Sequence, residues 1–131
     1  MTLFFTLLSL LACAGAPDDT GTAASLTIVS PAEEATVCGT PLVILTEVEN
    51  FTLVAPGDGT EELPPGTGHI DVAVNGQEQE DWMFGGEELV LPEVGDGYWR
   101  LQVELSNADH SAIAPYAGDT VYVTIDATVC E

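Results

Sequence analysis

Apolar and polar residues alternate with a period of two along most of the chain after residue 25. The apolar members of the clearest runs are Ile70, Val72 and Val74; Trp99, Leu101, Val103 and Leu105; and Val121, Val123 and Ile125. Successive side chains of a β-strand point to opposite faces, so each run predicts a strand with one buried face. Leu42, Ile44 and Val48 share a face in the same way. No segment of useful length has the 3.6-residue period of a helix.

Turn-forming residues separate these runs. They are Ser30-Pro31, Pro56-Gly57-Asp58-Gly59, Pro64-Pro65-Gly66, Asn75-Gly76, Gly85-Gly86 and Gly95-Asp96-Gly97. Glycine and asparagine accept a positive φ, and proline fixes φ while removing a hydrogen-bond donor. Short half-buried strands need a second layer to cover their apolar faces, and the simplest such layer is another sheet. Residues 26–131 are therefore predicted to form one all-β sandwich of about seven strands.

The first 12 residues form an uncharged apolar run that is too short to span a bilayer as a helix. Its length is typical of a signal peptide. Leu10-Leu11-Ala12-Cys13 resembles the lipobox of bacterial lipoproteins. This resemblance implies cleavage before Cys13 and a diacylglycerol on its sulfur, with residues 1–12 as the signal peptide. The alternative is an ordinary signal peptide in which Cys13 has no special role.

Residues 13–25 are small, polar and acidic without periodicity, which predicts a flexible tether behind the lipidated cysteine. Residue 14 is Ala rather than an acidic residue. In the lipoproteins that the motif resembles, this favours the outer membrane over the inner one. We therefore expect an exported protein, lipid-anchored at the outer membrane and either periplasmic or surface-exposed.

Charge narrows the range of partners. The chain has 22 Asp and Glu residues against a single basic residue, Arg100, which gives a formal net charge of −21. Such a charge repels phosphate backbones, so no nucleic-acid partner is expected. The acids are dispersed rather than gathered in a tail, which is typical of a solvated surface or of a protein adapted to a salty medium. Calcium binding by some of the carboxylates is the alternative.

Several stretches resemble known bacterial domains. Residues 26–37, LTIVSPAEEATV, are similar to the opening of many bacterial immunoglobulin-like domains. GHIDVAVNG at 68–76, GYWRLQVEL at 97–105 and NADH at 107–110 resemble strands of the DUF4399-like periplasmic domains. The likeness covers about residues 26–126 and implies an immunoglobulin-like or fibronectin-III-like sandwich. Two departures from that pattern are Asp71, where the family usually carries a second histidine, and the displaced proline at Pro115.

The other two cysteines, Cys38 and Cys130, are predicted to form a disulfide. An exported chain with one lipidated cysteine has two left in an oxidising compartment, so one bond accounts for both. Two free buried thiols, or a bridge from Cys130 to another chain, are the alternatives.

The only histidines, His69 and His110, offer a candidate metal site. His69 and Asp71 have strand spacing and are expected on one face, and Asp109 precedes His110. Imidazole and carboxylate ligands suit zinc or copper, and Met83 could add a soft ligand for cuprous ion. The alternative is two unrelated surface histidines. A metal ion is the only cofactor that the sequence suggests.

No nucleophile lies in a catalytic motif, and adjacent acids such as Glu87 and Glu88 would face opposite ways on a strand. The protein is therefore not expected to be an enzyme. The first function that the sequence favours is a membrane-anchored, non-catalytic binding or structural module with a protein or carbohydrate ligand. The second is a periplasmic metal-binding lipoprotein that uses His69 and His110.

Overall fold

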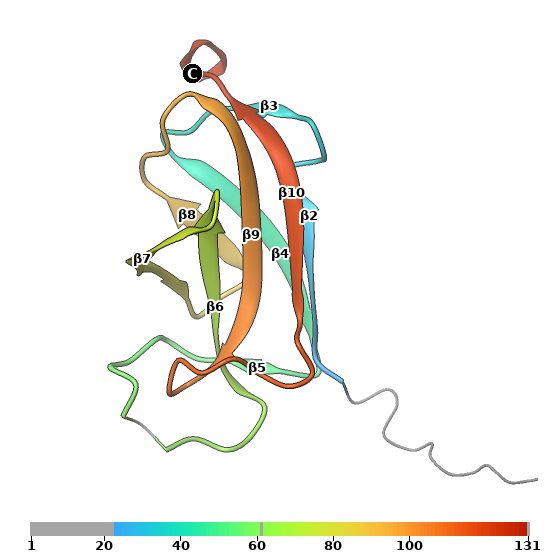
Figure 1. The fold of residues 1–131 in the computed structure, drawn as a ribbon, viewed down its shortest axis with the longest axis vertical. Coiled ribbons are helices and arrows are strands. Elements are labelled where there is room, and N and C mark those ends of the chain that lie inside the picture. The colour runs from blue at the N-terminus through green and yellow to red at the C-terminus, as the bar shows by residue number, and fades with distance from the viewer. Residues whose placement is uncertain (1–22, 61, 131) are drawn as a thin grey trace, which may run out of the picture.

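The computed structural model describes residues 23–60 and 62–130, and within them the chain forms two packed sheets (Figure 1). The smaller sheet has three strands in the order β2-β4-β8, all antiparallel. Its strands are β2 (Ser25–Ser30), β4 (Leu42–Glu49) and β8 (Glu88–Leu91). The lipobox, Cys13 and most of the expected tether lie outside the described residues.

The larger sheet has six strands, in the order β3-β10-β9-β6-β5 with β7 also paired to β6. These are β3 (Thr36–Val37), β5 (Thr52–Leu53), β6 (Thr67–Val74), β7 (Gln77–Phe84), β9 (Gly97–Asn107) and β10 (Gly118–Ile125). The short strands β3 and β5 pair in parallel with β10 and β6, and the other pairs are antiparallel. A single turn of 3₁₀ helix, η3 (Ala127–Val129), follows β10.

This topology is immunoglobulin-like. The first, second and fifth long strands (β2, β4 and β8) form one sheet, and the third, fourth, sixth and seventh (β6, β7, β9 and β10) form the other. Among the described residues, seven strands have four or more residues. The predicted all-β sandwich of about seven strands is therefore confirmed.

The core lies between the two sheets and consists of the apolar faces that the alternation marks. Its fully buried large side chains include Leu42, Ile44, Ile70, Val72, Leu89, Leu91, Leu101, Val103, Leu105, Val123 and Ile125. Within β4 the burial alternates residue by residue from Leu42 to Glu47, as expected for a strand with one face in the core. The burial of apolar surface, which contributes a free energy of about 25 cal/mol per Å², is the main interaction that holds the two sheets together.

One predicted turn sets the pairing of β6 with the start of β7, before the register shifts between Ala73 and Asp71. Asn75 and Gly76 both have positive φ, 53° and 83°, and Val74 pairs directly with Gln77. A two-residue hairpin loop with positive φ at both positions matches the right-handed twist of its strands. The Asn75 side chain also accepts a hydrogen bond from the backbone N–H of Arg100, 2.7 Å away, which ties the hairpin to β9.

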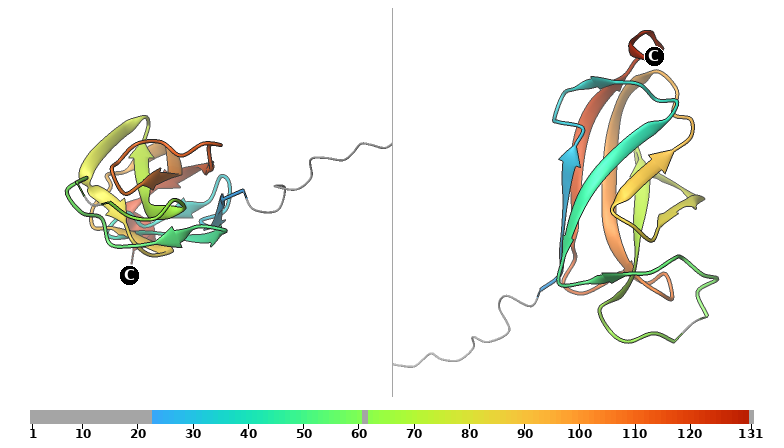
Figure 2. Two further views of the ribbon diagram at one scale, coloured as in Figure 1. Left: turned by 90° about the horizontal axis from the view of Figure 1, so that it is seen from below. Right: turned by 180° about the vertical axis from the view of Figure 1, so that it is seen from behind.

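The sandwich has two distinct ends (Figures 1 and 2). β2 starts at the end that holds β5 and the loop that follows it, whereas η3 and the C-terminus lie at the opposite end. Within the described residues, no helix is long and apolar enough to cross a membrane.

Candidate functional site

The structure brings the two histidines together on the outer face of the larger sheet. Because Ile70 and Val72 of β6 face the core, His69 and Asp71 face away from it. His110 lies in the turn after β9, and its ring packs edge-on against His69 with the centroids 5.1 Å apart and the planes at 87°. His69 is only 1% exposed, whereas His110 is exposed. The expected shared face of His69 and Asp71 is confirmed.

The buried end of this cluster is polar. His69 Nε2 lies 3.1 Å from Asp71 Oδ1, but the contact is not aligned as a hydrogen bond, and both atoms are buried without a hydrogen-bond partner. The other oxygen of Asp71 accepts a hydrogen bond from the hydroxyl of Ser106 on β9. A buried polar atom without a well-formed hydrogen bond costs free energy. The contact between His69 and Asp71 therefore stabilises the fold less than the short distance between their atoms suggests.

Two small loops converge on the exposed ring of His110. Asp109 accepts hydrogen bonds from the hydroxyl and the N–H of Ser111, 2.5 and 3.0 Å away, and these bonds lower the pKa of Asp109. Asp58 makes the same pair of bonds to Thr60, which lower the pKa of Asp58. Gly59 lies between Asp58 and Thr60, and a Cβ added to Gly59 would be 3.5 Å from His110 Nδ1. These two carboxylates therefore stay ionised beside His110 in mildly acidic solution.

The cluster of Ser106, Asp71 and His69 lacks the arrangement of a hydrolytic triad. In such a triad the serine donates to the imidazole, and the carboxylate orients the imidazole. Here the hydroxyl of Ser106 donates to the carboxylate instead, and Ser106 is 2% exposed, so a substrate has no access to it. This geometry provides no activated nucleophile.

The metal prediction named His69, His110 and Asp71, and these three side chains do lie together. Among residues 23–60 and 62–130, however, no group of three or more His, Cys, Asp and Glu side chains is arranged to hold a metal ion. No observation tests a zinc or copper site at His69, His110 and Asp71, and this site stays a prediction.

The predicted disulfide between Cys38 and Cys130 is confirmed. Their Cα atoms are 4.9 Å apart, and the bond closes a sequence separation of 92 residues. Cys38 follows β3 and Cys130 follows η3, so the bond joins the start of the domain to its end. This pairing leaves neither cysteine available for metal binding or catalysis.

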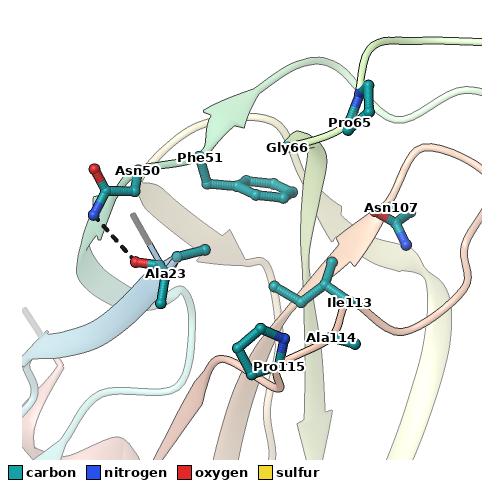
Figure 3. A pocket seen from close by; sticks show the side chains of 10 residues that line it. Ala23, Asn50, Phe51, Pro65, Gly66, Asn107, Ile113, Ala114 and Pro115 are labelled. Carbon is teal, nitrogen blue, oxygen red and sulfur yellow. Dashed lines mark hydrogen bonds between the residues drawn. The ribbon is translucent and has the colours of Figure 1, made fainter. Parts of the chain in front are cut away.

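A cavity of about 570 Å³ opens at the end of the sandwich where β2 begins (Figure 3). Phe51 and Ile113, both half-buried and packed against the core, contribute its largest apolar side chains. The rest of the lining is Ala23, Ala24, Asn50, Pro65, Gly66, Asn107, Ala114 and Pro115. Its volume lies in the range of about 300–1,000 Å³ that is usual for ligand pockets.

The lining of this pocket carries no ionisable side chain, although the chain has 22 Asp and Glu residues. Its side-chain amides are engaged within the protein. Asn50 donates to the carbonyl of Ala23 at 3.1 Å, and Asn107 donates to Ser111 Oγ at 3.1 Å and to the carbonyl of Ala112 at 3.3 Å. The pocket can therefore accept an uncharged, mainly apolar group.

Comparisons with known proteins give similar solved structures but no family. No protein-family model and no curated protein sequence matches the chain. The fibronectin(III)-like modules of Clostridium thermocellum CbhA align with a TM-score of 0.48 and 13% identity, over 84% of this chain and 50% of that chain. The PKD domain of human KIAA0319 aligns with a TM-score of 0.36 and 13% identity, over 86% of this chain and 92% of that chain. The chain thus spans about half the length of the CbhA structure.

Sequence reasoning missed Ser106 and the pocket residues Phe51 and Ile113. Ser106 follows Arg100, Gln102 and Glu104 at every second position of β9, on the face that points away from the core. Its orientation could therefore have been predicted from the alternation. Its position beside His69 depends on the register of β9 against β6, which pairs these two residues directly. Phe51 and Ile113 lie in connections outside the long strands, where no periodicity marks them.

Proposed function

We propose that the protein is an exported, lipid-anchored, non-catalytic binding module whose end pocket receives an uncharged apolar side chain of a protein ligand. The observation that carries this proposal is the uncharged lining of a cavity of about 570 Å³ on so acidic a chain. Apolar pockets with a few placed polar groups are the usual form of binding sites. The pocket is also built by connections at one end of a rigid sandwich, which is where binding residues concentrate.

The anchor is supported by the sequence, through the lipobox-like Leu10-Leu11-Ala12-Cys13 at the end of an apolar run. A tether of residues 13–25 would lead from the lipid to β2, which begins beside the pocket. This arrangement would place the pocket at the end of the domain nearer to the membrane. Outer-membrane attachment follows from Ala14 by the same resemblance.

The pocket is tested by methyl NMR of the full-length protein with labelled isoleucines. Benzyl alcohol, a neutral aromatic probe, should shift the δ-methyl signal of Ile113 and leave that of the core residue Ile44 unchanged. Ala114→Asp should abolish this shift because it places a charge in the apolar lining. The matched control, Ala32→Asp, adds the same charge in the turn before β3 and should keep the shift.

Two results would contradict the pocket assignment. One is an Ile113 signal that no concentration of benzyl alcohol moves. The other is a response to methyl glucoside but not to benzyl alcohol, which would favour a carbohydrate ligand over an apolar side chain.

The anchor is tested separately with Cys13→Ser. We expect this variant to lose labelling by a fatty-acid analogue and to leave the membrane fraction, whereas Cys38→Ser should retain both. Full labelling and sedimentation of the Cys13→Ser protein would refute lipidation at Cys13.

A further inference from the structure

The outer face of the three-stranded sheet carries a group of exposed aliphatic side chains. Val43 and Val90 are direct cross-strand neighbours on β4 and β8, and Leu45 follows Val43 on the same face. Val29 lies at the bulge of β2, next to the Ser30 that pairs with Leu45. The exposed fractions are 54% for Val29, 36% for Val43, 40% for Leu45 and 42% for Val90. We call these four residues the apolar stripe.

Acidic residues border the apolar stripe on this face. Glu88 is the cross-strand partner of Leu45, and Glu47 and Glu49 continue the outward positions of β4. All three are exposed. Figure 2 (right) shows this sheet from its outer side, with β4 between β2 and β8. Along β4 the outward face thus changes from apolar to acidic within four positions.

The protein has almost no positive charge to complement this border. Its one basic residue, Arg100, is on β9 in the other sheet. A partner that carries positive charge would therefore complement Glu47, Glu49 and Glu88 without competition from a basic residue of this sheet. Matched charges speed the encounter of two partners and fix their orientation, while the apolar centre contributes affinity.

Other occupants fit this surface less well. In a symmetric dimer the same surface faces itself, so the three glutamates of two chains of charge −21 would be brought together. An anionic membrane would repel the same carboxylates. A neutral apolar partner would leave the border without a counter-charge.

We propose that the apolar stripe and its acidic border bind a protein segment that presents aliphatic side chains beside lysine or arginine. The three strands have six, eight and four residues. At about 3.4 Å per residue and about 4.8 Å between strands, they offer a face of roughly 300 Å². This is well under half of the ~800 Å² per partner of a standard interface, so the complex is weak and reversible. The lipid anchor is not required for this interaction, and the end pocket is a separate site.

The experiment measures fluorescence anisotropy of a labelled peptide in which a run of valines is followed by a run of lysines, titrated with the full-length protein. The double variant Val43→Thr/Val90→Thr should weaken binding at least tenfold because it replaces two exposed methyl groups by hydroxyls. Glu47→Gln/Glu88→Gln should weaken binding and flatten its dependence on NaCl between 0.05 and 0.5 M, because screening then has less attraction to remove. Glu62→Gln, on a loop away from this sheet, is the charge control and should change neither.

A second peptide, in which serine replaces valine, separates the apolar contribution from the charge, and we expect it to bind at least tenfold more weakly. Equal binding of the two peptides would overturn the proposal, because charge alone would then account for the interaction. Unchanged binding by the Val43→Thr/Val90→Thr protein, or no binding of the valine–lysine peptide at millimolar concentration, would also overturn it. Loss of the pocket response in Ala114→Asp with peptide binding intact would show that the two sites are independent.

Discussion

Removing the disulfide between Cys38 and Cys130 should cost the domain a large part of its stability. The double variant Cys38→Ser/Cys130→Ser is the cleaner perturbation because it retains the local polar contacts. The N–H of Thr40 donates to Cys38 Sγ at 3.3 Å, and a serine hydroxyl can accept the same bond. The variant therefore removes the covalent link and little else.

The size of the effect follows from the loop that the bond closes. For a sequence separation of 92 residues, the chain-entropy model gives about 4.6 kcal/mol at 25 °C. The unfolding entropy near the midpoint is about 2.1 cal/mol/K per residue, so for a domain of roughly 107 residues this converts to a fall of about 20 °C. Compaction of the unfolded chain reduces the loss, but mutual repulsion of the carboxylates expands that chain and limits the reduction.

Thermal unfolding followed by circular dichroism measures the change, with mass spectrometry to verify the state of the thiols. Wild-type protein in reductant should match the double variant, and in wild-type protein without reductant neither Cys38 nor Cys130 should be alkylated. Amide exchange adds a local measurement, because the N–H of Asp126 donates to the carbonyl of Val37 at 3.0 Å beside the bond. A midpoint within two degrees of the wild type would refute the reasoning from chain entropy.

Two further predictions concern individual side chains. The hydroxyl of Tyr98 donates a hydrogen bond to Glu34 Oε2 at 2.5 Å, and this bond raises the pKa of Tyr98 to about 12. The stability that this hydrogen bond gives the folded protein is complete below pH 10 and is lost as the pH rises toward 12. Absorbance at 295 nm should therefore show that one of the three tyrosines ionises at a higher pH than the others. In the Glu34→Gln variant the pKa of Tyr98 should return toward 10. A common titration of all three tyrosines near pH 10 would contradict this prediction. If His69, His110 and Asp71 bind zinc or copper, calorimetry should show saturable binding that His110→Ala removes and Glu62→Gln preserves, and absence of binding at 1 mM metal would end that hypothesis.

Much of the fold could be predicted from alternation because β4, β9 and β10 each bury mainly one face. The runs at Leu42–Glu49, Ile70–Val74, Trp99–Leu105 and Val121–Ile125 all lie in strands, and Asn75-Gly76 forms the expected hairpin turn. The short strands β3 and β5 could not be predicted in this way, because two residues carry no period. Their parallel pairing is set by long-range packing.

The candidate sites were predictable only in part. Strand spacing is a local property, and it correctly put His69 and Asp71 on one face. The burial of His69 depends on Ser106 and His110, which reach it through the pairing of β6 with β9 and the turn that follows β9. The end pocket combines the segment before β2 with three connections that are distant from it in sequence. The apolar stripe depends on the pairing of Val43 with Val90.

The bond between Cys38 and Cys130 also determines how the protein responds to mechanical tension. A pull between Ala23 and Cys130 passes through residues 23–38 and then across the sulfur bridge, so the chain between the two cysteines lies off the load path. At roughly 3.4 Å per residue, residues 23–38 reach a fully extended length of only about 50 Å, compared with about 360 Å for the unbridged chain from 23 to 130. Under load the first strands can peel away while β4 to β10 remain in a closed covalent ring.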